Sequence, residues 1–290
     1  PHSLAALKEE NYRDHPLEVR RSLRFCERRS HEEAVCLWAD AFAATSTEIA
    51  ERLNSHMRVA PEQMFYFPAG VDRRHFRRHG DEELGPTYEY LSERTGLEVE
   101  TLRRSRIVFE TSRMDRTKRK DILLAAFAKA GKGREDALCI IGGGPENDVM
   151  KALEAQRQAD PVLRERAFLL GFVPDEMIPP LFGRADIFVT ASEMEGFGLS
   201  AAQAAVAGAA LVSSDLVPFA LQYVPEDSIV VPAGDVDGFA EAIAALLDDD
   251  EDRARRARNL VELTTSLDWI EQTKAFLAHL RSLCIAVREP

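Results

Sequence analysis

The sequence has no apolar run long enough to cross a bilayer, and it has little positive charge. Its longest apolar stretch, Ala201 to Val212, is rich in alanine and shorter than the about 20 residues that a membrane helix needs. Acidic residues outnumber basic ones by 49 to 37, which gives a formal net charge of −12. Because phosphate backbones bind basic surfaces, we expect no nucleic-acid partner. No signal-peptide pattern is present, so we expect a soluble, cytoplasmic protein.

Cysteine and histidine are too few and too scattered for a disulfide framework or a zinc site. Cys139 lies in an apolar run, and we expect a buried free thiol there. His75 and His79 lack the glutamate of an H-E-x-x-H motif. The Asp235-Val236-Asp237 pattern directly precedes a predicted helix, so we interpret Asp235 as an N-cap rather than a metal ligand. These patterns therefore predict no zinc site and no metal bound by the Asp235-Val236-Asp237 segment.

Several nucleotide-binding and hydrolase motifs are also missing. The sequence contains no P-loop, no G-x-S-x-G elbow and no G-x-G-x-x-G fingerprint. The glycines Gly142, Gly143 and Gly144, followed by Pro145, do not match that fingerprint. They would let a base or a ribose lie against the backbone, or they form only a turn, and the sequence favours neither alternative.

Short apolar runs alternate with helical segments between about residues 104 and 266. Strands are predicted at 107–109, 137–141, 167–170, 186–190, 210–213 and 228–231, and helices at 121–130, from 146 onward, and at 174–182, 199–207 and 235–247. Continuous apolar strands that alternate with helices are typical of a parallel sheet covered on both faces. The pattern predicts an α/β fold with a Rossmann-like, doubly wound sheet. Such sheets bind ligands at the carboxyl ends of their strands.

The segment before residue 104 has a different pattern. Two strand-like runs, 41–44 and 64–67, flank a capped helix at 46–53, and two strands are too few for an independent parallel sheet. We predict three parts: residues 1–103 as a partial α/β domain, 104–266 as the ligand-binding domain and 267–290 as a carboxyl-terminal helix. Within the first part we interpret 73–103 as a surface insertion or linker. Because the chain begins at Pro1, we expect processing or a longer parent protein, and bare apolar surface would favour self-association.

A basic loop follows the first strand of the predicted sheet. In Thr111-Ser112-Arg113-Met114-Asp115-Arg116-Thr117-Lys118, two cations stand five residues apart between a strand and a helix. The guanidinium of Arg113 offers a fork of donors and the ammonium of Lys118 a mobile point charge, so both can bind a diphosphate. The alternative is an ordinary solvated loop.

A glycine-containing turn follows the fourth strand. Gly196 and Gly198 would let the backbone approach a ligand closely, and the next helix would present free N–H groups to negative charge. Glu195 is placed to accept hydrogen bonds from sugar hydroxyls. The alternative is a plain turn with a helix-capping acid. The succession of a strand, a glycine turn and a helix makes this alternative less favoured.

Five segments together resemble the large group of retaining glycosyltransferases with the GT-B fold that includes sucrose-phosphate synthase and sucrose synthase. They are Phe67 to Asp72, the loop with Arg113 and Lys118, Ile141 to Pro145, Leu170 to Pro174, and Glu195-Gly196-Phe197-Gly198-Leu199. Each segment is common by itself, whereas the ordered set is specific. The resemblance implies a GT-B fold whose acceptor-side domain is incomplete at the amino terminus.

The resemblance also implies residue roles. Arg113 and Lys118 would bind the donor diphosphate and stabilise the departing nucleotide, so that neither a metal nor another cofactor is expected. Glu195 and the backbone of Gly196, Phe197, Gly198 and Leu199 would hold the sugar and the phosphates. His2 would contact the donor sugar. In the family, a second acid binds the hydroxyls of the ribose. At that position this sequence has Gln203, which carries no charge.

The implied activity is transfer of a hexose from a UDP- or GDP-hexose to an acceptor such as a sugar phosphate. Two alternatives remain open at this point: a nucleotide-sugar-binding fragment without catalysis, suggested by Gln203, and a sugar-nucleotide epimerase or phosphorylase on the same fold.

Overall fold

The computed structural model describes residues 4–13 and 16–286, which form two compact units. The sheet unit comprises Gly70–Met194 and Gly198–Thr273. The amino-terminal unit comprises the chain up to Ala69, together with Glu195–Phe197 and the segment from Lys274 onward. None of the helices in the described part of the chain combines the length and apolar character that a membrane crossing requires.

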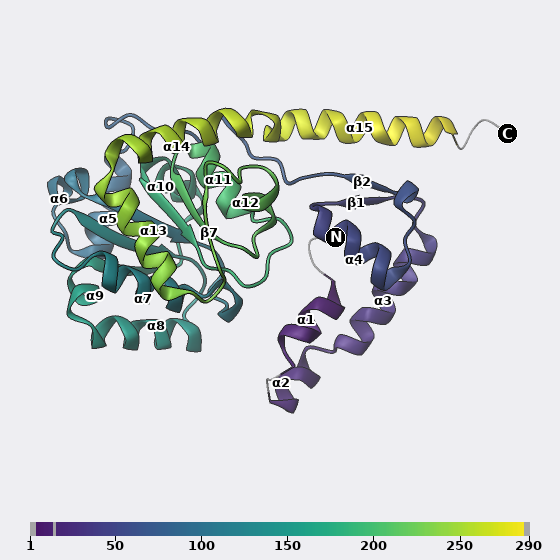
Figure 1. Cartoon of the computed structure of the whole chain (residues 1–290), viewed down its shortest axis with the longest axis horizontal. Helices are drawn as coiled ribbons and strands as arrows, with labels where there is room; N and C mark the ends of the chain where they lie inside the picture. Colours follow the sequence, from purple (N-terminus) through teal and green to yellow (C-terminus); the bar gives the residue numbers. More distant parts are fainter. Residues whose placement is uncertain (1–3, 14–15, 287–290) are drawn as a thin grey trace. The chain divides into compact units, whose positions relative to one another are not determined.

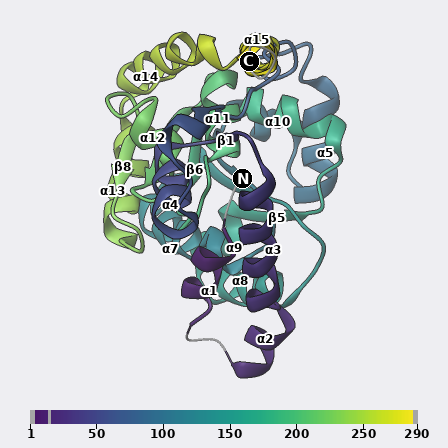
Figure 2. The ribbon, with the colours of Figure 1, turned by 90° about the vertical axis from the view of Figure 1, so that its right-hand side faces the viewer.

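The sheet unit is built on six parallel strands in the order β5-β4-β3-β6-β7-β8, with β5 and β8 at opposite edges (Figure 2). All six strands were predicted from the sequence, and their parallel pairing is confirmed. Their bounds are β3 Arg106–Thr111, β4 Ala137–Gly142, β5 Ala167–Gly171, β6 Ile187–Thr190, β7 Ala210–Ser214 and β8 Ile229–Val231.

Helices cover both faces of this sheet (Figure 1). On one face, α7 (Lys120–Ala130), α8 (Asp148–Ala159), α9 (Pro161–Arg166) and α13 (Val236–Asp248) bury the side chains of Val108, Ile141 and Val189. On the other face, Phe182 of α10 (Ile178–Arg184) packs edge-on against Phe109 at 5.4 Å between ring centroids. The fold is therefore the doubly wound arrangement that the sequence predicts.

The sheet unit contains further α-helices. They are α5 (Gly85–Thr95), α6 (Val99–Arg104), α11 (Leu199–Ala207), α12 (Pro218–Gln222), α14 (Asp250–Leu263) and the start of α15 (Trp269–Ala286).

The carboxylate of Asp235 accepts a hydrogen bond from the Gly238 amide at 3.0 Å, which confirms Asp235 as the N-cap of α13. Cys139 is confirmed as a buried free thiol, and its burial raises its pKa.

The interpretation of residues 73–103 as a surface insertion or linker is wrong. This segment contains α5 and α6, and it belongs to the sheet unit. Four of its apolar side chains, those of Leu84, Tyr88, Leu91 and Leu102, are at most 4% exposed. The surrounding polar residues conceal this short apolar stripe in the sequence, because two short helices need only a few buried side chains to pack.

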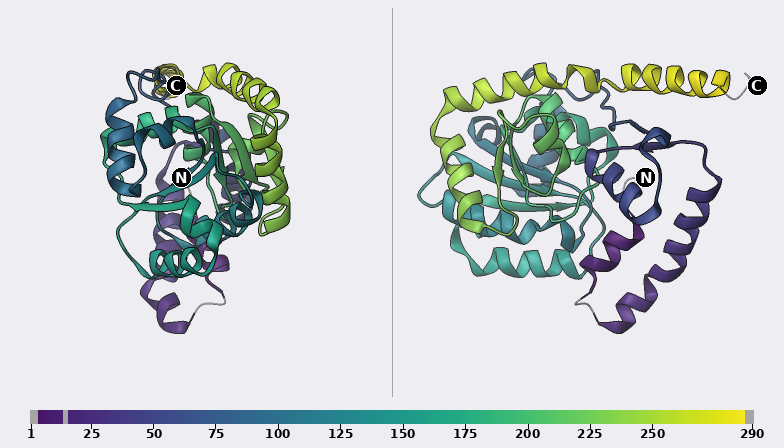
Figure 3. Two further views of the ribbon diagram at one scale, coloured as in Figure 1. Left: turned by 90° about the vertical axis from the view of Figure 1, so that its left-hand side faces the viewer. Right: turned by 45° about the vertical axis from the view of Figure 1, so that its right-hand side comes forward.

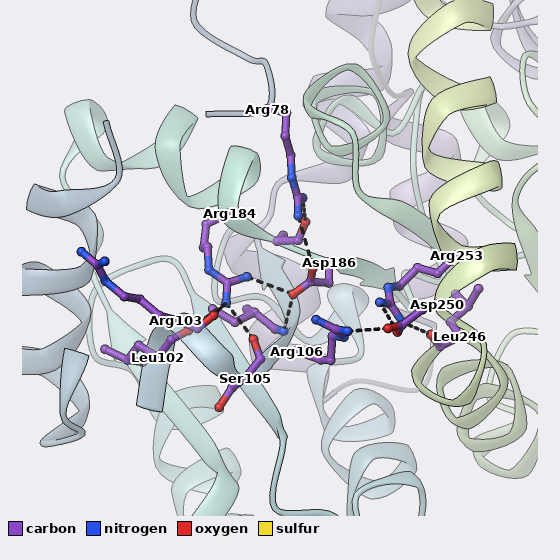
Figure 4. A network of polar contacts seen from close by, with 12 residues as sticks. Arg78, Leu102, Arg103, Ser105, Arg106, Arg184, Asp186, Leu246, Asp250 and Arg253 are labelled. Atoms are coloured by element: carbon purple, nitrogen blue, oxygen red, sulfur yellow. Dashed lines mark hydrogen bonds and ion pairs between the residues drawn. The ribbon is translucent and has the colours of Figure 1, made fainter. Parts of the chain in front are cut away.

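Arg184 and Asp186 hold α6 against the amino ends of the strands (Figure 4). The Arg184 guanidinium lies 2.9 Å from the Asp186 carboxylate and donates to the carbonyl oxygens of Leu102 and Ser105 at 2.8 and 2.7 Å. Asp186 also accepts a hydrogen bond from the backbone amide of Ile107 at 2.9 Å. Both side chains are nearly buried, so this network fixes the end of the sheet opposite to the one where ligands of such folds bind.

The amino-terminal unit contains a two-stranded parallel sheet, β1 (Phe42–Ala44) and β2 (Met64–Tyr66), joined through α4 (Thr47–Met57). Ser46 accepts a hydrogen bond from the Ile49 amide and caps α4, as its position predicts. Three helices precede the sheet: α1 (Ala5–Asn11), α2 (Leu17–Ser22) and α3 (Phe25–Trp38), shown in purple in Figure 3. The two strands and the helix between them lie where the sequence predicts them.

Candidate functional site

The segments singled out in the sequence follow β3, β4 and β6 at the carboxyl edge of the sheet. The chain continues from β3 to its neighbour β4 on one side, and from β6 to its neighbour β7 on the other. The strand order therefore reverses between β3 and β6. In open α/β sheets this reversal leaves a crevice beyond the strand ends in which ligands bind, which makes this edge the candidate site.

The loop after β3 gathers its charges around Asp115. The Asp115 carboxylate accepts hydrogen bonds from the backbone amide and the hydroxyl of Thr117 at 2.9 and 2.8 Å. Desolvation alone would raise the pKa of Asp115, but these hydrogen bonds and the nearby charges of Arg113 and Lys118 lower it overall. Both predicted cations thus help to lower the pKa of the same carboxylate, that of Asp115. The side chain of Arg113 is exposed.

The glycine loop after β4 packs directly on the loop after β3. Gly143 has a φ of +115°, and a Cβ atom there would lie 1.7 Å from the carbonyl oxygen of Ser112. At Gly144 a Cβ would lie 2.7 Å from the Cβ of Met114, and the side-chain amide of Asn147 donates to the Met114 carbonyl at 2.7 Å. The glycines are therefore required for contact between the two loops, whereas contact of Gly142, Gly143 and Gly144 with a ligand stays a prediction.

The loop after β6 is joined to the loop after β3 by two contacts. The Glu193 amide donates to the carbonyl oxygen of Thr117 at 2.9 Å. The Glu193 carboxylate also pairs with the Arg119 guanidinium at 3.0 Å. The loop after β3 thus contacts the loops that follow both neighbouring strands, β4 and β6.

Gly198 starts helix α11 in a conformation that favours glycine. Its φ is +101°, and a Cβ atom would lie 2.5 Å from Cγ1 of Val217. Leu199 is the first residue of α11, and Gln203 lies one turn further on, half-buried. The free N–H groups at this helix start suit an anion at the carboxyl edge.

Other predicted site residues lie outside the sheet unit. Glu195, Gly196 and Phe197 precede Gly198 in the chain but group with the amino-terminal unit. His2 lies outside the residues that the structure describes.

Sequence reasoning missed one buried ion pair, Lys120 with Glu110. The Lys120 ammonium lies 2.6 Å from the Glu110 carboxylate, and the two side chains are 0% and 4% exposed. The ammonium also donates to the carbonyl oxygens of Ser112 at 3.0 Å and of Gly142 at 2.7 Å. The available signal was an acidic residue at the end of an otherwise apolar strand, because a buried charge needs a partner.

The edge carries positive charge and backbone donors that suit an anion. Arg113 and Lys118 stand in the loop after β3, beside the glycine loop after β4, and the amino terminus of α11 follows β6. Preorganised donors of this kind stabilise negative charge that develops on a departing phosphate.

The fold defines an α/β domain of the GT-B type, and comparison with known proteins identifies the family. Residues 98–261 match the family described as "Glycosyl transferases group 1", and the chain belongs to that family. It is similar to the D-inositol 3-phosphate glycosyltransferase of Corynebacterium glutamicum, with 26% identity over 290 residues that cover 98% of this chain. The chain spans 66% of the length of that relative.

Solved structures share the fold. Sucrose-phosphate synthase from Thermosynechococcus elongatus superposes with a TM-score of 0.74 at 21% identity, covering 98% of this chain and 67% of that one. The Anabaena protein HepE in complex with UDP and glucose gives a TM-score of 0.71 at 19% identity, covering 84% of this chain and 63% of that one. The GT-B fold implied by the sequence resemblance is confirmed.

Proposed function

We propose that the chain carries the donor-binding half of a retaining glycosyltransferase that transfers a hexose from UDP- or GDP-hexose to a sugar phosphate. The observation that carries the proposal is the meeting of the loops after β3, β4 and β6 where the strand order reverses. Relatives support it: the C. glutamicum protein is named for a phosphorylated acceptor, and the HepE complex contains UDP and glucose.

In this proposal the leaving nucleotide is stabilised by protein groups alone. Arg113 and Lys118 bind the diphosphate, and the α11 amino terminus adds backbone donors. Glu195 and the backbone of Gly196 to Leu199 hold the donor sugar, His2 contacts it, and Gln203 accepts a hydrogen bond from the ribose. The growing charge on the diphosphate meets fixed cations and dipoles, so no metal is needed for this step.

The test is a calorimetric titration of the chain with UDP, GDP and ADP. We expect one nucleotide to bind selectively, and the Arg113→Ala/Lys118→Ala variant to bind it at least about 100-fold more weakly, since two charge-assisted contacts contribute roughly 1.5–3 kcal/mol each. Lys129→Met is the matched control, because Lys129 is an exposed cation of α7 paired with Asp237. Equal binding by the wild type and the double variant would contradict the proposed phosphate site.

The alternative of a binding module without catalysis rests on Gln203. It predicts nucleotide binding with no transfer by any protein that contains this chain. Release of nucleotide from a UDP- or GDP-hexose in the presence of a sugar phosphate would exclude it, and interconversion of the nucleotide sugar without an acceptor would instead indicate an epimerase.

A further inference from the structure

Two consecutive residues at the start of α7 connect the loop after β3 to both of its neighbours. Arg119, with a φ of +49°, pairs with Asp121 at 3.0 Å and with Glu193 of the loop after β6 at 3.0 Å. Lys120 points the other way, into the sheet unit, and its ammonium reaches the carbonyl oxygen of Gly142 in the loop after β4. The left-handed conformation of Arg119 is strained for a residue with a side chain, so the surrounding contacts must stabilise this turn.

The place of Glu110 explains how the ammonium of Lys120 comes to be buried. Glu110 lies two residues after Val108, on the face of the sheet that α7 covers. Lys120 is the first residue of α7, so its side chain meets the Glu110 carboxylate at 2.6 Å directly beneath the two loops. The ammonium donates hydrogen bonds to the carbonyl oxygens of Ser112 and Gly142, and it forms an ion pair with the Glu110 carboxylate.

A buried ion pair of this kind adds little to the stability of the folded state. Desolvation of the two charges offsets most of their attraction, and an apolar pair of similar volume serves a core as well or better. An apolar pair, however, could not hold two backbone carbonyl oxygens from two different loops. The ion pair therefore differs from an apolar pair in that it holds these two carbonyl oxygens in place.

We propose that Lys120, held by Glu110, is a positioning residue for diphosphate binding. It fixes the carbonyl of Ser112, the residue before Arg113, relative to the carbonyl of Gly142, the first residue of the glycine loop. This sets the spacing between the cation that binds the phosphates and the backbone that they approach. The inference rests on the proposed function, because it assigns Lys120 a role through the same site.

The test compares four proteins: the wild type, Glu110→Leu/Lys120→Met, Arg113→Ala and the combination of all three changes. The paired replacement removes both charges at once, so that no unpaired charge is left buried. Affinities for UDP and GDP are measured by calorimetry, and thermal midpoints by circular dichroism. Leu102→Ala serves as a destabilised control, because Leu102 is buried at the opposite edge of the sheet.

We expect the paired replacement to weaken nucleoside diphosphate binding at least about tenfold in the wild type and less than about twofold in the Arg113→Ala background. When two residues act through one another, the effects of their substitutions on affinity are not additive. A general loss of structure, in contrast, lowers the affinity by the same factor in both backgrounds. The Leu102→Ala control should lower the thermal midpoint and leave the affinity unchanged.

Each other outcome overturns the inference in a recognisable way. Unchanged affinity, or an equal loss in both backgrounds, would show that Lys120 does not act through the Arg113 loop. A paired variant that does not fold would show that the pair serves the core. Absence of diphosphate binding by the wild type would refute the proposed function itself, and the inference with it.

Discussion

Replacement of Gly143 by alanine is expected to abolish nucleotide binding and to destabilise the sheet unit by more than about 3 kcal/mol. The φ of +115° is strained for any residue with a Cβ atom, which alone costs about 1–3 kcal/mol. The new Cβ would also lie 1.7 Å from the Ser112 carbonyl oxygen, so one of the two loops must move. A displacement of about 1 Å at a binding site can cost about 100-fold in function.

Gly133→Ala is the matched control for this prediction. Gly133 also has a positive φ, +77°, but a Cβ atom there meets no atom within 4 Å. The control should therefore lose only about 1 kcal/mol and bind nucleotide like the wild type. Urea denaturation and calorimetric titration of both variants measure the two effects. If Gly143→Ala behaved like Gly133→Ala, the close contact between the two loops would be refuted.

Asp186→Ala is expected to destabilise the sheet unit by about 3–5 kcal/mol at neutral pH. The substitution leaves the Arg184 guanidinium, whose side chain is 8% exposed, without its carboxylate. Breaking a buried pair by removing one partner leaves an uncompensated charge in the interior, which carries a penalty of this size. Arg78, which lies 3.2 Å from Asp186, and the amide of Ile107 would lose the same acceptor.

Glu100→Ala provides the comparison, because Glu100 pairs with Arg104 on the surface of α6. Those side chains are 61% and 76% exposed, and we expect a change of less than about 0.5 kcal/mol. Urea denaturation followed by circular dichroism distinguishes the two variants. An equally small effect of Asp186→Ala would mean that the network in Figure 4 does not hold α6 to the sheet.

The sheet was predictable from the sequence because its strands are buried on both faces. Runs such as 137–141 and 210–213 are continuously apolar, and the glycine turns and N-caps between elements stand out. The same regularity placed the loops after β3, β4 and β6 at one edge. The GT-B assignment, in contrast, came from the ordered motifs and not from periodicity.

The contacts between loops were not predictable, because they join residues that are close only in the fold. Nothing in the sequence pairs Glu110 with Lys120, or the Ser112 carbonyl with Gly143, since strand register and the start of α7 decide these contacts. Helices α5 and α6 were missed for a related reason. Their buried side chains are few, and two arginines that look like surface residues in the sequence bind within the sheet unit: Arg184 binds carbonyl oxygens and Asp186, and Arg103 binds Asp81.

The central claim is that a nucleoside diphosphate binds at the carboxyl edge of the sheet. Amide hydrogen exchange, measured with and without saturating UDP or GDP, tests it most directly. The account predicts that nucleotide slows exchange in residues 112–120, 142–147 and 198–203 and leaves residues 78–81 and 103–106 at the amino edge unchanged. Binding that protects the amino edge, or that leaves 112–120 unprotected, would contradict it.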